Sequence, residues 1–238
     1  MYAKVKVLFY EIEKRYPYLA LLLLTIINKC LRITCKYMIN GLNNKICNDG
    51  AILKSVNFDI IGDNNTISIG YHTVLKGLHF RIRGSGHSIK IGTNCRFNKG
   101  GTLWLQDSNG TIEIGNKTSA EKIHIAVTEP SSQVSIGNNC LFAYDIDIRA
   151  GDSHSIICSE TGKRLNYAKN IHIDDHVWVA AHVIVLKGVR IGKNSVIATG
   201  SVVTKSCGEG VVMGGNPAMV IKENINWNRK MFYDDKIC

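Results

Sequence analysis

The sequence lacks a Cys-x-x-Cys pair, a regular cysteine framework and a hydrophobic run long enough to cross a membrane. Its eight cysteines therefore indicate reduced thiols in an intracellular protein rather than a set of disulfides. The uncharged stretch 16–28 has only about 13 residues, whereas a membrane-spanning helix needs roughly 20. Glu11 and Glu13 precede this stretch and no clear small-residue cleavage site is present, which also disfavours a secretory signal.

Acidic residues are also few. The chain has 19 aspartates and glutamates and 29 lysines and arginines, so its formal net charge is +10. This excess predicts an anionic partner, which could be a phosphorylated cofactor, a polyanionic glycan, a membrane surface or a nucleic acid. The basic residues are scattered, and no helix-turn-helix, zinc-finger or aromatic RNA-binding signature is present. We therefore expect no nucleic-acid partner.

What the chain does contain is a strict period of six residues. Between Ile173 and Val203 an aliphatic residue returns at every sixth position, and a Val or Ser follows four places after each of the first five. Neither a helix, with its period of 3.6, nor one long strand gives this period, so each hexad predicts a short strand followed by a turn. Coils of such strands form the hexapeptide type of parallel β-helix, with the aliphatic residues stacked in a narrow core. We therefore predict an all-β, parallel β-helix fold.

A second pattern carries this architecture toward the N-terminus. An Ile-Gly or Ile-Asp pair recurs at intervals of 22, 23, 22, 37 and 18 residues. An interval of 18 is three hexads, or one triangular coil, so the intervals of 22 and 23 indicate the same coil with a loop at one corner. Cys95 and Cys140 occupy the small position of their hexads and are predicted to lie in the core. The isoleucines of the pattern are Ile69, Ile91, Ile114, Ile136, Ile173 and Ile191.

These periods divide the chain into three parts. Residues 46–216 are predicted to form the β-helix, and residues 217–238 a short C-terminal helix or tail. Residues 1–45 combine basic and apolar side chains and are predicted to be helical. Such a segment would either pack on the first coil or a neighbouring subunit, or lie as an interfacial helix on an anionic inner-membrane surface.

The interval of 37 residues marks a long protruding loop at 151–170. A long excursion from a repetitive scaffold is more often functional than decorative. Asp152 and His154 follow directly after a predicted strand in this loop. An imidazole with a pKa near 6.5 is partly unprotonated at neutral pH and can act as a general base. A lone histidine is usually structural, so the residues alone leave both interpretations open.

Four segments follow one another in the second half of the chain. They are DSHSI (152–156), TGKRLN (161–166), HVWVAAHVIVLKGVRIGKNSVIATGSVVTKS (176–206) and GGNPAMVIK (214–222). In this order they resemble the left-handed β-helix acyltransferases of the hexapeptide-repeat superfamily, and in particular the bacterial capsule and polysialic acid O-acetyltransferases. The resemblance implies a left-handed parallel β-helix, acetyl-coenzyme A as acetyl donor, no metal, and a homotrimer with active sites in the grooves between protomers.

The resemblance also assigns roles to single residues. His154 matches the general base, and Asp152 would either orient its ring or cap the turn. Trp178 matches the tryptophan beside the pantetheine arm and the acceptor. The residues that match the contacts to coenzyme A are Ala180, Ala181, Thr199, Gly200, Lys205 and Lys222.

Counting corners along the coils gives a prediction about assembly. The loop with His154 leaves one corner, whereas Trp178 occupies the next corner, roughly 15 to 20 Å away at about 3.3 Å per strand residue. Both can line one site if the loop folds back across a side of the coil or if two subunits meet. The trimer of the family satisfies the second condition, and we predict a homotrimer.

The function predicted from these observations is transfer of acetyl from acetyl-coenzyme A to a hydroxyl of a bacterial surface glycan or its precursor. The enzyme is expected in the cytoplasm, with the N-terminal helix as a contact to the inner face of the membrane. One alternative is N-acetylation of an aminosugar, and another is a noncatalytic scaffold. A third is a zinc hydratase, but His172, His176 and His182 have spacings that place them on successive sides of the coil.

Overall fold

The structure is a computed structural model that describes residues 34–233 without a gap. Before residue 34 it describes only residues 14–16, 18–19, 22–23, 25–26 and 30, so the predicted N-terminal helical segment lies largely outside the described residues. The described part of the chain contains no helix long and apolar enough to span a bilayer.

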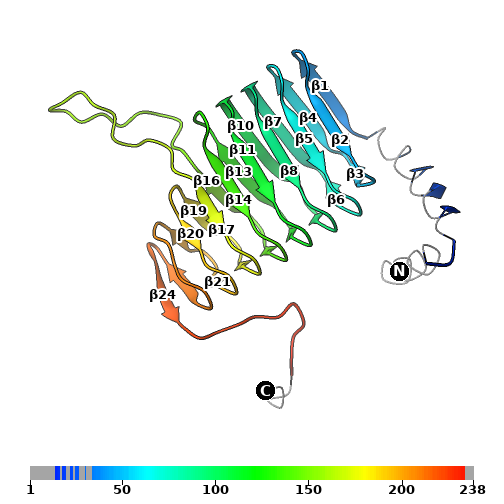
Figure 1. The fold of residues 1–238 in the computed structure, drawn as a ribbon. Coiled ribbons are helices and arrows are strands. Elements are labelled where there is room, and N and C mark those ends of the chain that lie inside the picture. Colours follow the sequence, from blue (N-terminus) through cyan, green and yellow to red (C-terminus); the bar gives the residue numbers. More distant parts are fainter. Residues whose placement is uncertain are drawn as a thin grey trace.

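Three sheets form the sides of a β-solenoid of about eight turns (Figure 1). Sheet A contains β1 (Lys36–Asn40), β4 (Asn57–Ile61), β7 (Leu78–Ser85), β10 (Gly101–Ser108), β13 (Ile123–Val127), β16 (Ile146–Arg149), β19 (Ile184–Leu186) and β22 (Val202–Val203). Sheet B contains β2 (Lys45–Asn48), β5 (Thr66–Ile69), β8 (Ser88–Ile91), β11 (Thr111–Ile114), β14 (Gln133–Ile136), β17 (Ile171–Ile173) and β20 (Arg190–Ile191). Sheet C contains β3 (Ile52–Lys54), β6 (Val74–Lys76), β9 (Arg96–Phe97), β12 (Ser119–Ala120), β15 (Leu141–Phe142), β18 (Trp178–Val179), β21 (Val196–Ile197), β23 (Val212–Gly215) and β24 (Ala218–Lys222).

The register of the strands follows the repeats that the sequence contains. The six isoleucines of the Ile-Gly and Ile-Asp pairs stack in sheet B, each as the parallel partner of the next, and all are buried. Cys95 and Cys140 are also fully buried, as predicted. Phe58 and Phe80 stack with ring centroids 4.8 Å apart. The prediction of an all-β solenoid built from hexapeptide repeats is therefore confirmed.

Each coil passes through sheets A, B and C in turn, so the solenoid has three corners, which we call AB, BC and CA. The residues that lengthen the early coils all lie between sheet A and sheet B, as predicted. In two of these coils, however, most of them extend the strands β7 and β10 rather than forming a loop, and only a short turn remains at corner AB. The predicted long loop lies at the same corner, between β16 and β17, and projects away from the solenoid (Figure 1). Within this loop, Ile157 and Arg164 form an antiparallel bridge, so the loop is a hairpin.

Both predicted ends of the β-helix differ from the structure. The solenoid begins at Lys36 rather than residue 46, because Tyr37 of β1 stacks on Phe58 with ring centroids 5.0 Å apart and so extends the core. After Pro217 the chain forms β24, which pairs antiparallel with β23, and an extended tail to Tyr233. The helix offered as one alternative for 217–238 is therefore wrong over the described residues, since β24 covers the free edge of β23 instead.

Candidate active site

The predicted base, His154, lies at corner AB, where the chain leaves β16. Ser153 immediately before it has a φ of 63°, in the left-handed region that non-glycine residues rarely adopt. The side chain of His154 is exposed. The sharp turn at Ser153 therefore presents the imidazole on the outside of the solenoid.

Asn166 connects the two ends of the long loop. Its side chain is buried, with 8% exposed, although most of the loop is exposed. Its Nδ2 donates hydrogen bonds to Asp152 Oδ2 and to the carbonyl oxygen of His154, both at 2.7 Å. Its Oδ1 accepts a hydrogen bond of 2.7 Å from the backbone N–H of Ile156. No role was predicted for Asn166 from the sequence.

Asp152 turns its carboxylate toward Asn166 and Lys187, and the Lys187 ammonium donates a short hydrogen bond to Oδ2. Burial alone would raise the pKa of Asp152, but the hydrogen bonds from Lys187 and Asn166 outweigh burial, and the pKa lies below its ordinary value. Asp152 therefore carries a negative charge at neutral pH and holds the turn. The described residues contain no hydrogen bond between this carboxylate and the His154 ring, and a role in orienting the ring stays a prediction.

Charged residues of the neighbouring coils fasten this loop. Arg164 Nη2 contacts Glu129 Oε1 at 2.6 Å, in the turn between β13 and β14. Lys187, which follows β19 in the next coil, donates a 2.9 Å hydrogen bond to the carbonyl oxygen of Asn166. We refer to Asn166, Asp152, Arg164, Glu129 and Lys187 as the loop clamp. The clamp ties the two ends of the long loop to the coils on both sides.

Trp178 lies on β18 in sheet C and is 37% exposed, consistent with a ring that points outward. The C-terminal tail packs against it, with the Trp227 ring 6.0 Å from the Trp178 ring. Trp227 also stacks on His176 at 4.2 Å and donates a 2.7 Å hydrogen bond from Nε1 to the His176 carbonyl. The tail, to which the sequence assigned no chemistry, thus borders one side of Trp178.

The four small residues predicted to contact the donor come together at corner CA. Ala180 and Ala181 follow β18, and Thr199 and Gly200 follow β21 in the next coil. The N–H of Gly200 donates a 2.9 Å hydrogen bond to the Ala181 carbonyl. A Cβ built on Gly200 would meet nothing within 4 Å, so the surface here is open.

The predicted phosphate-binding lysines lie apart from this strip. Lys205 follows β22 and shares corner AB with His154, whereas Lys222 ends β24 in sheet C. Both are exposed, and neither forms an ion pair within the part of the chain that the structure describes. One chain therefore presents the predicted base with Lys205 at corner AB and the small residues at corner CA. Trp178, which was predicted at a corner, lies instead on the strand of sheet C that precedes Ala180 and Ala181.

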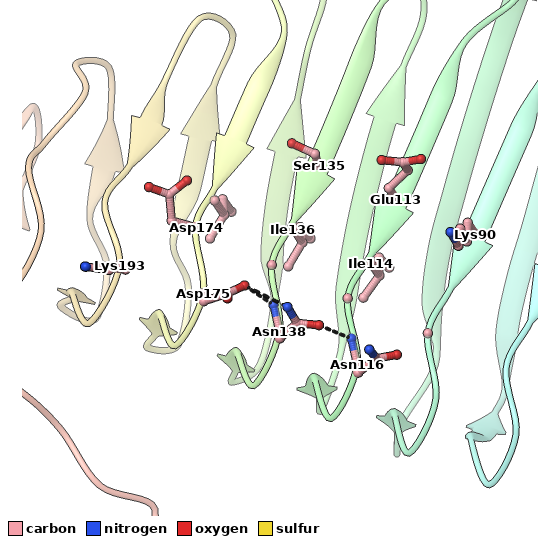
Figure 2. Close-up of a pocket in the computed structure, with 14 residues that line it drawn as sticks. Lys90, Glu113, Ile114, Asn116, Ser135, Ile136, Asn138, Asp174, Asp175 and Lys193 are labelled. Carbon is pink, nitrogen blue, oxygen red and sulfur yellow. Dashed lines mark hydrogen bonds between the residues drawn. The ribbon is translucent and has the colours of Figure 1, made fainter.

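A groove of about 670 Å³ runs along the outside of sheet B near corner BC (Figure 2). Glycines of the Ile-Gly pairs line it together with side chains of both charges. Backbone N–H groups at the rim donate to side chains one coil away, from Asn138 to Asp175 and from Asn116 to Asn138. None of the predicted site residues lines the groove, whose labelled residues are Lys90, Glu113, Ile114, Asn116, Ser135, Ile136, Asn138, Asp174, Asp175 and Lys193.

The three histidines weighed for zinc do not converge. His172 Nδ1 lies 2.6 Å from Ser135 Oγ on sheet B, and His176 is engaged by Asn139 and the tail at corner BC. His182 lies at corner CA, 3.6 Å from Asp145. Among the described residues no group of three histidine, cysteine or acidic side chains is placed to share a metal ion.

Known proteins resemble this chain at the level of both sequence and structure. The family model described as bacterial transferase hexapeptide (six repeats) matches residues 170–205. The polysialic acid O-acetyltransferase of Neisseria meningitidis is 34% identical over 215 residues, which cover 85% of this chain and 95% of that protein. The crystal structure of the polySia specific acetyltransferase NeuO matches with a TM-score of 0.78 and 32% identity, covering 86% of this chain and 92% of that one.

Another relative is matched over a shorter region. The polysialic acid O-acetyltransferase of Escherichia coli O1:K1 / APEC is 37% identical over 100 residues, or 40% of this chain. The match spans about a third of that relative's length, 33%.

Proposed function

The chain belongs to the hexapeptide-repeat acetyltransferases, and from this premise we propose that it transfers acetyl from acetyl-coenzyme A to a hydroxyl group of a capsular polysialic acid or a related surface glycan. The observation that carries the proposal is the 34% identity to a polysialic acid O-acetyltransferase over 95% of that relative. The net charge of +10 suits a polyanionic acceptor of this kind.

His154 would act as the general base. Its unprotonated ring nitrogen would take the proton of the acceptor hydroxyl while that oxygen attacks the thioester carbonyl carbon. The tetrahedral intermediate would then expel the coenzyme A sulfur, which takes the proton back from the imidazolium. An alcohol is a poor nucleophile at neutral pH, and base catalysis of this kind is worth about 10² to 10⁴ in rate.

Acetyl-coenzyme A would supply the activated acetyl group, and the open strip at corner CA suits its pantetheine arm. Ala180, Ala181 and Gly200 have side chains small enough for an extended chain to lie against the backbone, and nothing occupies the space over Gly200. Trp178, beside this strip, would pack against the arm and the apolar face of the sugar. The exposed ammonium groups of Lys205 and Lys222 would meet the phosphates.

A homotrimer would complete the site. The predicted base lies at corner AB and the predicted donor strip at corner CA, with sheet A between them on one side and sheets B and C on the other. We propose that corner AB of one protomer faces the Trp178 side of its neighbour, in solenoids that wind left-handedly as in the family. Since acetyl-coenzyme A is a cytoplasmic donor, the reaction would take place on the cytoplasmic side of the membrane.

The first experiment measures transfer directly. Purified protein is incubated with acetyl-coenzyme A and a panel of polysialic acid, other capsule polymers, O-antigen and free sugars, and thiol release is followed together with the glycan mass. We expect His154→Ala to lower the rate by about 10² to 10⁴. His172→Ala, which removes an exposed histidine of sheet B, serves as the matched control and should retain activity. Cleavage of the product by neutral hydroxylamine distinguishes an ester from the amide that an N-acetyltransferase would form.

Absence of thiol release with every acceptor would overturn the proposal, and so would full activity of His154→Ala. The shared site is tested by mixing inactive His154→Ala and Trp178→Ala chains under conditions that exchange subunits. If each site takes His154 from one protomer and Trp178 from the next, every trimer that contains both variants regains one intact site, which is about a quarter of all sites in a random equimolar mixture. No recovery in verified mixed trimers would mean that each chain supplies both groups itself.

A further inference from the structure

Asn166 differs from the rest of the long loop in its burial. The residues from Asp152 to Ile157 and from Ser159 to Lys163 are exposed, whereas the Asn166 side chain is buried. A buried amide is costly unless its donors and acceptors are paired. The position of Asn166 therefore depends on the hydrogen bonds that it makes.

All the hydrogen-bonding capacity of this amide is used. An asparagine side chain offers two N–H donors and an oxygen with two lone pairs. In Asn166 the donors go to Asp152 Oδ2 and the His154 carbonyl, and Oδ1 accepts from the Ile156 N–H and, at 3.3 Å, from Arg164 Nε. One side chain thus holds the backbone just before, at and just after His154.

The amide is itself held in place from both neighbouring coils. Lys187 binds the Asp152 carboxylate and the Asn166 carbonyl, and Arg164 joins the same carbonyl, at 3.2 Å, to Glu129. Charge-assisted hydrogen bonds of this kind are stronger than those between neutral groups. The left-handed turn at Ser153, which costs energy in a non-glycine residue, is bridged by the contacts of Asn166 on either side.

We propose that Asn166 is a positioning residue that fixes the backbone at His154 and so sets where the imidazole meets the acceptor hydroxyl. The inference rests on the proposed function, because it assumes that His154 is the base. Asn166 touches no predicted reacting atom and acts only through His154. Long surface loops are usually mobile. The loop clamp instead holds the backbone at His154 in one position, as a strand would.

The expected effect on kinetics follows from the separation between Asn166, at corner AB, and the predicted donor strip. The predicted donor strip lies at corner CA, so loss of Asn166 should leave the KM for acetyl-coenzyme A within about twofold of wild type. A misplacement of about 1 Å at the reacting groups can cost about 10²-fold in rate. We therefore expect kcat to fall by about 10- to 100-fold in Asn166→Ala.

Two further variants separate hydrogen bonding from shape. Asn166→Asp keeps the shape but replaces the Nδ2 donor with an oxygen facing Asp152 Oδ2 and the His154 carbonyl, so we expect the same loss as with Ala. Asn170→Ala is the matched control, because Asn170 ends the same loop but pairs with the Gln133 N–H at 2.9 Å and not with the turn at His154. It should keep kcat within about twofold of wild type.

A double mutant tests whether Asn166 acts through His154. In a His154→Ala background, Asn166→Ala should lower the residual rate by less than about twofold, because the group that it positions is gone. A full additional 10- to 100-fold loss in that background would overturn the proposal. Equal losses of kcat in Asn166→Ala and Asn170→Ala would also overturn it, since any disturbance of the loop would then suffice.

Backbone hydrogen exchange gives a readout that does not depend on activity. Peptides that cover 152–158 should exchange faster in Asn166→Ala than in wild type or Asn170→Ala, because the Ile156 N–H loses its acceptor. Unchanged exchange there would overturn the positioning role even if kcat fell. If the wild-type enzyme transfers no acetyl to any acceptor, the proposed function fails, and faster exchange at 152–158 still supports the anchoring of the backbone.

Discussion

Adding one methyl group to the glycine column should destabilise the solenoid by a predictable amount. Gly115 lines the groove along sheet B and faces the backbone of the next coil. A Cβ at Gly115 would lie 2.6 Å from the carbonyl carbon of Gly137 and 2.7 Å from its oxygen. These are backbone atoms that cannot rotate away, and the two coils are joined here by a 2.8 Å hydrogen bond from the Gly115 N–H to the Ile136 carbonyl.

The magnitude follows from the shortfall in space. Ordinary contact begins at 3.4 Å, so in Gly115→Ala the coils must separate by about 0.8 Å at this point. Overpacking of this kind costs about 1 to 3 kcal/mol. For a protein of this size, each 1 kcal/mol shifts the Tm by about 2 to 4 °C, which gives a fall of about 2 to 12 °C.

Gly208 provides a matched control at the last position of the same column. It lies over Gly192, but a Cβ built on Gly208 itself meets nothing within 4 Å. Both substitutions restrict the unfolded chain equally, an effect that stabilises by about 0.4 to 1 kcal/mol. Gly208→Ala should therefore melt at or slightly above the wild-type temperature.

Thermal melts followed by far-UV circular dichroism, at one protein concentration and pH, give the comparison. Only the difference between the two variants matters, because it removes the common effect on the unfolded state. If Gly115→Ala melted within 1 °C of Gly208→Ala, the coils would be able to yield at the glycines, and the steric reasoning for the Ile-Gly pairs would be refuted.

Two further predictions concern buried titrating groups. Burial lowers the pKa of His87, so below pH 6.5 the unfolded chain binds a proton that the folded chain does not, and stability should fall with pH from 6.5 down to the lowered pKa, by up to about 1.4 kcal/mol per pH unit. Urea titrations between pH 5 and 8 should show a shallower slope for His87→Gln, and an identical slope would contradict this. Burial raises the pKa of Cys140 to about 12, whereas the Thr161 hydroxyl beside Cys158 lowers the pKa of that thiol. Iodoacetamide at pH 8 should therefore label Cys158 and spare Cys140 in the folded protein, as mass spectrometry of the peptides would report, and equal labelling would be inconsistent with the fold.

The solenoid could be predicted from the sequence because its contacts repeat at fixed intervals. Residues one coil apart are neighbours, so Ile114 pairs with Ile91 and Ile136 as the spacing of 22 and 23 residues indicates. The corner that carries the loops follows from the same count. The start at Lys36 was missed because β1 precedes the first Ile-Gly pair and carries no repeat signature.

The loop clamp could not be predicted, because its contacts join residues at irregular separations. Asn166 reaches Asp152 across 14 residues and Lys187 across 21, and Arg164 reaches Glu129 across 35. Only the path of the loop brings these groups together. The tail was missed for the same reason, since the contact between Trp227 and His176 spans 51 residues and follows no period.

The clamp also bears on how the two halves of the proposed site meet. Counting corners left two possibilities, a loop that folds back across a side of the coil or a second subunit. The structure ties both ends of the loop to corner AB through Asn166, and the hairpin beyond projects away from the solenoid (Figure 1). His154 lies at the tied end, only two residues after Asp152, so its ring cannot travel across sheet B to Trp178 without breaking the clamp. The clamp therefore favours the second possibility, in which His154 of one chain and Trp178 of a neighbouring chain line one site, and this shared site stays a prediction.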